Sequence, residues 1–148
     1  MEVVPHPSFY SKTTSDGIPM RKIALLHGKN CLATTVYQRC VYWSTGRKCR
    51  FCGIELSLES GATITLKTPR QFGEVFEAAL EEGICSHITL TTGTTASPDR
   101  GAKLLTEVVK EVKAIRNVPT HVQVEPPEDD RYLEILAGAG ADTIGIHV

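Results

Sequence analysis

The chain has 148 residues, of which 41% are hydrophobic and 22% charged, the composition of an ordinary globular protein with one core. Its formal net charge of −1 gives no electrostatic reason to expect binding to nucleic acid or to an anionic membrane surface. No apolar run approaches the roughly 20 residues of a membrane-spanning helix, and the first residues lack a secretory pattern. Five cysteines without an export signal favour metal or catalytic thiols over a disulfide framework. We therefore expect a cytoplasmic protein.

The N-terminal segment, residues 1–22, is expected to form an irregular arm, because it contains several prolines and an Asp16–Gly17 turn. Two short strands should follow, at 23–27 and 31–37, where the sequence is apolar and β-branched. We expect residues 23–148 to form a single domain.

Three of the five cysteines, Cys40, Cys49 and Cys52, follow the second expected strand closely. The Cys-x-x-Cys pair lets a tight turn aim two sulfurs at one metal ion or cluster. The basic residues between positions 47 and 50 lower the pKa of nearby thiols and favour the thiolate that binds metal. This stretch is therefore predicted to be a metal-binding loop.

The residues alone do not decide which side chain is the third metal ligand. Cys31 lies nine positions before Cys40, just as Cys40 lies nine before Cys49, so either thiol is a candidate. A structural zinc site needs four protein ligands, which Cys31, His27 or His87 would complete. That alternative predicts a zinc-stabilised α/β binding domain without catalysis.

A helix is clearly indicated after the cysteine loop. Residues 54–66 have a mixed pattern, in which 63–66 is either a short strand or an extended connection. Thr68 and Gln71 then form a capping box, followed by apolar residues at helical spacing. Gly83 is expected to end this helix.

Strands and helices alternate from residue 87 onward. Strands are expected at 87–92, 120–125 and 141–148, with helices beginning at Ser97–Asp99 and at Asp129 or Asp130. Short connections between such elements predict right-handed βαβ units and a parallel sheet, hence an α/β fold.

Each of these strands has one apolar and one polar face. In the middle strand Val122 and Val124 oppose His121, Gln123 and Glu125. A sheet covered by helices on both sides should be apolar on both faces, whereas a barrel around a wet cavity has this half-polar pattern. The alternative is a polar face that simply meets solvent.

The last expected strand ends the sequence and would leave an open sheet edge. We therefore expect the 148 residues to be the N-terminal part of a longer barrel. The alternative is a compact open sheet completed by a partner chain.

The cysteine stretch resembles the radical S-adenosylmethionine (radical SAM) superfamily, whose usual signature is Cys-x3-Cys-x2-Cys with an aromatic residue before the third cysteine. Phe51 before Cys52 matches, but the usual spacing would put the first ligand at Thr45, whereas this chain has Cys40. The surrounding residues resemble an uncharacterised subfamily from nitrilase-associated gene clusters of bacteria. The resemblance implies parallel βα units in a partial, incomplete TIM-like barrel.

The resemblance also implies the cofactors. A [4Fe–4S] cluster would be held by Cys40, Cys49 and Cys52, and its free iron would bind S-adenosylmethionine. An electron from a donor such as flavodoxin or ferredoxin would cleave the sulfonium and yield a 5′-deoxyadenosyl radical. That radical would abstract hydrogen from an unknown small-molecule substrate.

Further site residues follow from the same resemblance. Thr92, Gly93 and Thr94 stand where the family commonly has a Gly-Gly-Glu-like segment that contacts the methionyl amine. Glu125, at the end of the next strand, is a second candidate contact. Two polar residues of the barrel interior would line the substrate space, namely Gln123 and His147.

Overall fold

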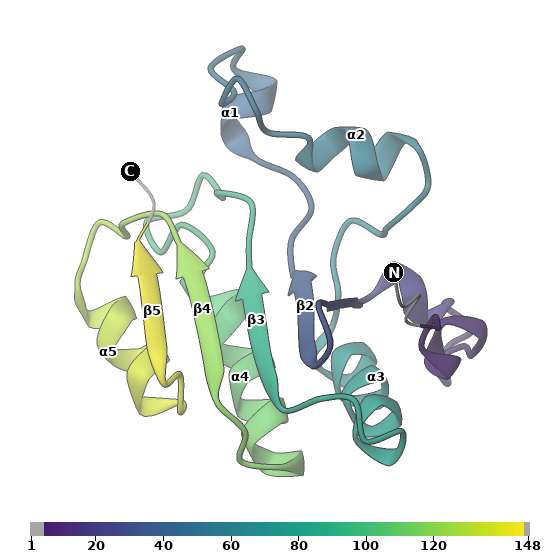
Figure 1. The fold of residues 1–148 in the computed structure, drawn as a ribbon. Coiled ribbons are helices and arrows are strands. Elements are labelled where there is room, and N and C mark those ends of the chain that lie inside the picture. Colours follow the sequence, from purple (N-terminus) through teal and green to yellow (C-terminus); the bar gives the residue numbers. More distant parts are fainter. Residues whose placement is uncertain (1–4, 147–148) are drawn as a thin grey trace.

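A single five-stranded sheet organises the computed structural model, which describes residues 5–146 (Figure 1). Its order along the sheet is β1 (Leu25–His27), β2 (Cys31–Thr35), β3 (His87–Thr91), β4 (Thr120–Val124) and β5 (Thr143–Ile146). β1 pairs antiparallel with β2, and the other four strands are parallel. The expected α/β class and parallel units are confirmed. The described strands form an open sheet and not a closed barrel, since β1 and β5 remain its two edges.

The three longest helices connect the parallel strands and cover one face of the sheet (Figure 1). They are α3 (Pro69–Glu81), α4 (Ala102–Ile115) and α5 (Arg131–Gly138). Two short helices, α1 (Val41–Ser44) and α2 (Ile54–Glu59), lie beyond the carboxyl ends of the strands. Two 3-10 helices, η1 (Ser8–Ser11) and η2 (Met20–Lys22), belong to the N-terminal segment. Within residues 5–146 no helix has the length and apolar character needed to cross a membrane.

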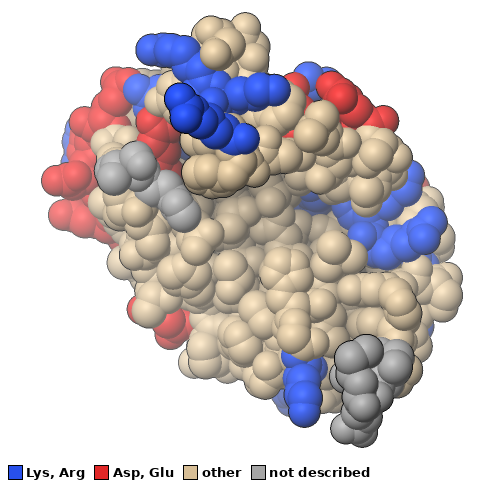
Figure 2. All heavy atoms as spheres, turned by 45° about the horizontal axis from the view of Figure 1, so that its top comes forward, with Lys and Arg blue, Asp and Glu red and all other residues tan. Residues whose placement is uncertain are grey.

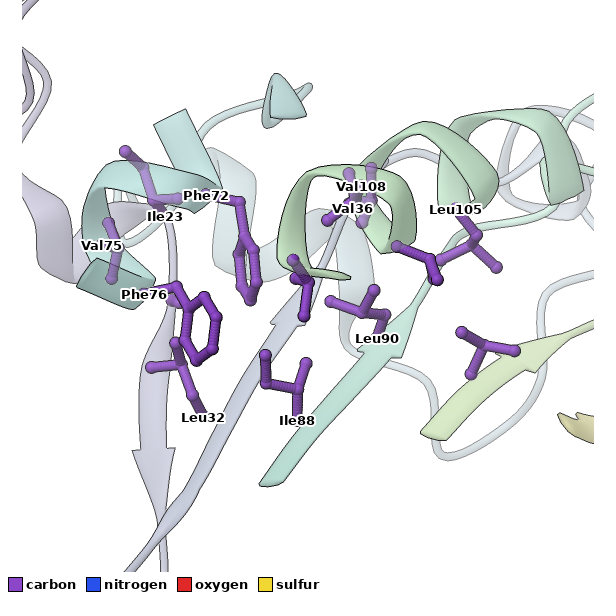
Figure 3. Packing of buried hydrophobic residues seen from close by; sticks show 14 of the residues in the cluster. Ile23, Leu32, Val36, Phe72, Val75, Phe76, Ile88, Leu90, Leu105 and Val108 are labelled. Atoms are coloured by element: carbon purple, nitrogen blue, oxygen red, sulfur yellow. The ribbon is translucent and has the colours of Figure 1, made fainter. Parts of the chain in front are cut away.

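The hydrophobic core lies between these helices and the sheet (Figure 3). In β3, Ile88 and Leu90 are fully buried, whereas the alternate residues Thr89 and Thr91 are half-buried on the opposite face. β4 shows the same alternation. The sheet is therefore apolar under the helices and polar on its other side, as the sequence predicted.

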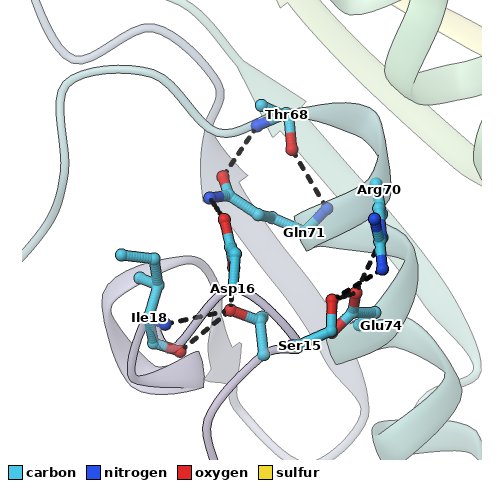
Figure 4. A network of polar contacts seen from close by, with 8 residues as sticks. Ser15, Asp16, Ile18, Thr68, Arg70, Gln71 and Glu74 are labelled. Carbon is cyan, nitrogen blue, oxygen red and sulfur yellow. Dashed lines mark hydrogen bonds and ion pairs between the residues drawn. The ribbon is translucent and has the colours of Figure 1, made fainter.

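The N-terminal segment is packed against α3 through polar contacts (Figure 4). The Thr68–Gln71 capping box forms as predicted, with the Gln71 amide donating to Thr68 Oγ1 at 3.2 Å. Gln71 Nε2 also donates to Asp16 Oδ2 at 2.7 Å. Phe9, from the same segment, is fully buried in the core. The arm is thus fixed at both a polar and an apolar contact.

Of the two alternatives for residues 63–66, the extended connection is the one that forms, since only an isolated bridge joins Tyr37 to Leu66. The preceding helix α2 was not expected, and it buries no residue that would mark it in the sequence. The helix expected from Ser97–Asp99 begins instead at Ala102. The intervening residues form a turn in which Gly101 has a φ of +103°, a conformation that favours glycine.

Candidate functional site

The cysteine loop projects from the carboxyl ends of the parallel strands, where α/β folds place their chemistry (Figure 1). Cys40 is the N-cap of α1, and Cys52 lies two residues before α2. The Cys52 amide donates to the Cys49 carbonyl at 3.2 Å, which closes the expected turn between these two cysteines. All three thiols are free.

The three thiols are on one loop but are not gathered into a metal-binding group among the described residues. Cys49 is exposed, whereas Cys40 and Cys52 are half-buried. Among residues 5–146, no three His, Cys, Asp or Glu side chains lie close enough together to hold a metal ion. The ligand set therefore stays a prediction.

Cys31 lies at the opposite end of β2 from this loop. It is the first residue of the strand and pairs with His27 on one side and His87 on the other. Its sulfur is 3.5 Å from Thr89 Oγ1. At the usual rise per residue, the four steps to Thr35 cover about 13 Å. The candidates for a fourth zinc ligand thus cluster away from Cys49 and Cys52.

The segment after β3 lies directly against the start of the cysteine loop. The Gly93 amide donates to the Tyr37 carbonyl at 2.8 Å, and the Val41 amide donates to the Thr94 carbonyl at 2.9 Å. A Cβ at Gly93 would lie 2.0 Å from the Arg39 carbonyl oxygen, so only glycine allows this approach. The candidate cofactor segment 92–94 is therefore next to Cys40.

Glu125, which follows β4, contacts the same loop from another side. The Tyr42 hydroxyl donates to Glu125 Oε1 at 2.5 Å, and this bond raises the pKa of Tyr42. Glu125 Oε2 is buried and has no hydrogen-bond partner among the described residues. The same holds for Trp43 Nε1. Buried polar atoms in native proteins nearly always have partners, so these two atoms have capacity left for a ligand.

The residue types at this site suit the cofactors that the sequence resemblance implies, although the three thiols are not gathered into one group among the described residues. Three free thiols supply sulfur ligands, and the unpartnered carboxylate oxygen of Glu125 suits an ammonium group. Lys48 Nζ lies 4.2 Å from the centroid of the Trp43 ring, which keeps positive charge beside the thiols. Figure 2, turned toward this end of the molecule, shows Lys and Arg atoms gathered along its upper edge above a recessed centre of uncharged residues.

A cavity of about 360 Å³ lies over the polar face of the sheet. Thr35, Thr91 and Gln123 line it from three successive parallel strands. Gln123 thus faces the space that the sequence predicted for it, whereas His147 lies outside the described residues. Lys67 lines the cavity from the connection before α3, and Gln38 from the connection after β2.

Lys67 is the most unusual group in this cavity. Its side chain is only 1% exposed, and Nζ donates to Gln38 Oε1 at 2.9 Å. Burial lowers the pKa of the ammonium to about 8. Nothing in the sequence marks Lys67 as unusual, because it follows a stretch without periodicity or motif.

The fold and the site together define an α/β domain of parallel βα units that carries a cysteine loop at the carboxyl ends of its strands. A family model described as the radical SAM superfamily matches residues 45–148, more than two thirds of the chain. The chain belongs to the radical SAM superfamily. The matched region contains Cys49 and Cys52 but begins after Cys40. No curated protein and no solved structure is significantly similar to it.

Proposed function

We propose that this chain is a radical SAM enzyme whose [4Fe–4S] cluster is held by Cys40, Cys49 and Cys52. S-adenosylmethionine is bound beside it by residues 92–94 and by Glu125. When bound, the two cofactors supply the one-electron chemistry that starts a radical reaction on a small molecule, with a flavodoxin or ferredoxin as electron donor. The observation that carries this proposal is the attachment of the cysteine loop to both candidate cofactor contacts, through Val41 and Tyr42.

The two attachments determine what α1 does in this proposal. The bond from the Val41 amide to Thr94 fixes the residue directly after Cys40. The bond from Tyr42 to Glu125 fixes the next residue. Cys40 thereby lies next to segment 92–94, while Cys49 and Cys52 lie further along the loop, where Cys49 is exposed and Cys52 is half-buried. In this proposal residues 47–53 move so that all three thiols reach the cluster.

Glu125 and the threonines offer acceptors for an ammonium group. Glu125 Oε1 already accepts from Tyr42, which leaves Oε2 for the ligand. Thr92 Oγ1 donates to the Gly93 carbonyl at 3.0 Å, so its hydroxyl oxygen keeps lone pairs for a further donor. A methionyl ammonium has three hydrogens to place, and these two side chains supply acceptors for them.

The zinc-binding alternative is less well supported. A closed zinc site needs a fourth ligand. The candidates Cys31 and His87 are the first residues of β2 and β3, and His27 of β1 lies beside Cys31, so all three are at the end of the sheet opposite the cysteine loop. Cys31 contacts Thr89 and not the loop. Three thiols with one open position suit a cluster that binds a further ligand better than a structural zinc ion.

The deciding experiment is anaerobic reconstitution of the full chain with iron and sulfide. We expect about four irons per chain and a broad absorbance at about 400 nm, as for a [4Fe–4S] cluster. Cys40→Ala should lose iron, whereas Cys31→Ala should keep it. Cys85→Ala is a matched control, because Cys85 is also half-buried and, among the described residues, donates only to the His87 carbonyl, at 3.6 Å.

The reduced, reconstituted protein should then release 5′-deoxyadenosine from S-adenosylmethionine, and Glu125→Gln should weaken S-adenosylmethionine binding at unchanged iron content. A colourless protein that holds one zinc per chain would refute the proposal. Iron retained in Cys40→Ala and lost in Cys31→Ala would transfer the third ligand to Cys31.

A further inference from the structure

Lys67 is a buried lysine that has no carboxylate partner among residues 5–146. Lys67 is 1% exposed, and its only acceptor among the described residues is Gln38 Oε1, at 2.9 Å. An ammonium has three hydrogens to donate, so two of them have no acceptor from the described chain. Burying a charge with so little compensation is costly, and burial accordingly lowers the pKa of Lys67 to about 8. Lys67 therefore keeps hydrogen-bond donors for a ligand in the cavity that it lines.

The cavity beside Lys67 is positively charged. Arg21 and Lys22 line it as well, and its described lining contains neither Asp nor Glu. On the sheet side, the hydroxyl oxygens of Thr35 and Thr91 are 2.9 Å apart and hydrogen-bonded to each other, so the pair keeps at most one hydroxyl hydrogen for a ligand. A recess with cations and low-dielectric walls concentrates field lines and attracts anions.

The cavity is also on the side of the sheet that leads to the cysteine loop. Gln38 Nε2 donates to the Ile54 carbonyl at 3.1 Å, and Ile54 lies two residues after Cys52. Lys67, Gln38 and the start of α2 therefore form one hydrogen-bonded chain from the cavity to the loop. The volume of about 360 Å³ is at the lower end of the range for small-molecule sites, which favours a small ligand.

We propose that Lys67 binds an anionic group of the substrate, a carboxylate or a phosphate, inside this cavity. Gln38 positions the ammonium, and the anion supplies the acceptors that the protein lacks. The attraction between the Lys67 ammonium and an anion is stronger in a recess than in water. This ion pair therefore orients the substrate relative to the cysteine loop. The assignment rests on the proposed function, because it names the substrate class of the same enzyme.

A purely structural role for Lys67 explains less. Its bond to Gln38 does hold the start of α2, but a neutral donor would do so without the cost of a buried charge. Structural ammonium groups in cores are normally surrounded by acceptors, and the described residues give Lys67 one.

Anion binding can be measured directly at this side chain by NMR of the full chain labelled with ¹³C at lysine Cε. The Lys67 resonance is identified by its absence in Lys67→Met, or in Lys67→Arg if the first variant does not fold. Acetate, malonate and inorganic phosphate are titrated separately at constant pH and ionic strength. The exposed Lys110 of α4, which pairs with Glu107, is the internal control.

We expect a saturable shift of the Lys67 resonance with at least one of the three anions, and at least a tenfold smaller change at Lys110. Saturation with malonate or acetate alone assigns a carboxylate substrate, and saturation with phosphate alone assigns a phosphorylated one. No saturable shift with any of them, or equal shifts at both lysines, overturns the proposal. The readout needs no cluster, so a chain that binds anions but no iron would refute the proposed function while keeping the anion-binding site at Lys67.

Discussion

The hydroxyl of Tyr42 in α1 donates a hydrogen bond to a carboxylate oxygen of Glu125 at the end of β4, 2.5 Å away. This contact joins residues that are 83 positions apart and fixes the cysteine loop against the end of β4, the third of the four parallel strands. Because the partner is an anion, the bond strengthens with the charge on Glu125 and opposes ionisation of the phenol. The contact can therefore be detected by titration.

The first prediction is that Tyr42 ionises at a higher pH than an ordinary tyrosine. The hydrogen bond to Glu125 is the largest cause of this raised pKa, followed by burial and by repulsion from the carboxylate. Subtracting the near-ultraviolet absorbance of Tyr42→Phe from that of the wild type isolates the phenolate of this residue during a pH titration. Its midpoint should lie above 10, the usual value for tyrosine.

Glu125→Gln should move this midpoint down, since the amide carries no charge. Glu134→Gln, which removes an exposed carboxylate of α5, is the control and should leave the midpoint in place. An unchanged midpoint in Glu125→Gln would show that the two side chains are not hydrogen-bonded in solution.

The second prediction concerns the close approach at Gly93. In Gly93→Ala the new methyl group would lie 2.0 Å from the Arg39 carbonyl oxygen, so the two backbone segments must separate. We expect a loss of about 1–3 kcal/mol in the free energy of unfolding, as for overpacking elsewhere, measured by urea denaturation. The shift of Cys40 relative to segment 92–94 should also lower iron uptake on reconstitution.

Gly138→Ala is the matched substitution. Gly138 is an exposed residue at the end of α5, and a Cβ there meets nothing within 4 Å. This variant should gain about 0.5–1 kcal/mol, because alanine favours a helix over glycine. Equal stability of the two variants would mean that the Arg39–Gly93 contact is looser than the structure has it.

Most of the fold could be predicted because its signals are local. The alternation of Ile88 and Leu90 with threonines indicated a strand with one buried face, and the capping box of Thr68 and Gln71 marked the start of α3. The sequence left a partial barrel and an open sheet as alternatives, because closure depends on pairing between distant strands, which no local pattern specifies. Helix α2 was missed for a related reason, since it buries no residue and so has no apolar stripe.

The candidate site was predictable only where its residues form a motif. The spacing of Cys49 and Cys52 indicated metal binding, and the family match includes both of these residues. Lys67 and Gln38 became visible only in the structure, because they are 29 positions apart and come together by packing. Tyr42 was likewise missed, since its role comes from a contact with β4.

The third prediction concerns the attachment of the N-terminal segment to α3. Hydrogen bonds from Thr14 and then from Gln71 lower the pKa of Asp16 below its ordinary value of 3.8. A carboxylate with a lowered folded-state pKa stabilises the protein above its unfolded pKa, and this contribution is lost as pH falls through the folded value. Asp16→Asn should therefore be less stable than the wild type at pH 7, and the difference should shrink below about pH 4.

Urea denaturation at pH 7 and at pH 3 measures this difference. Glu77→Gln, at an exposed position of α3, controls for the change in net charge and should show no such narrowing. A constant difference between Asp16→Asn and the wild type at both pH values would contradict the prediction.

The fourth prediction is the pH dependence that the buried Lys67 imposes on stability. Its folded-state pKa is about 8, against 10.5 for an ordinary lysine, so between these values the unfolded chain binds more protons than the folded one. The free energy of unfolding must then rise with pH across this window, because the cost of burying the charge is removed as the ammonium deprotonates. Relative to Lys67→Met, the wild type should gain stability on the order of 3 kcal/mol from pH 7 to pH 10.5.

The comparison with Lys67→Met is essential, because cysteines and tyrosines titrate in the same pH range. Their contributions to the free energy of unfolding cancel only in the difference between the two proteins. Lys110→Met removes an exposed lysine, so its free energy of unfolding should change with pH in parallel with that of the wild type. Denaturation is measured with a reductant and without carboxylate or phosphate buffers, since an anion bound at Lys67 would raise its pKa and move the window upward. Parallel curves for the wild type and Lys67→Met from pH 7 to pH 10.5 would mean that Lys67 is not buried as an ammonium in solution.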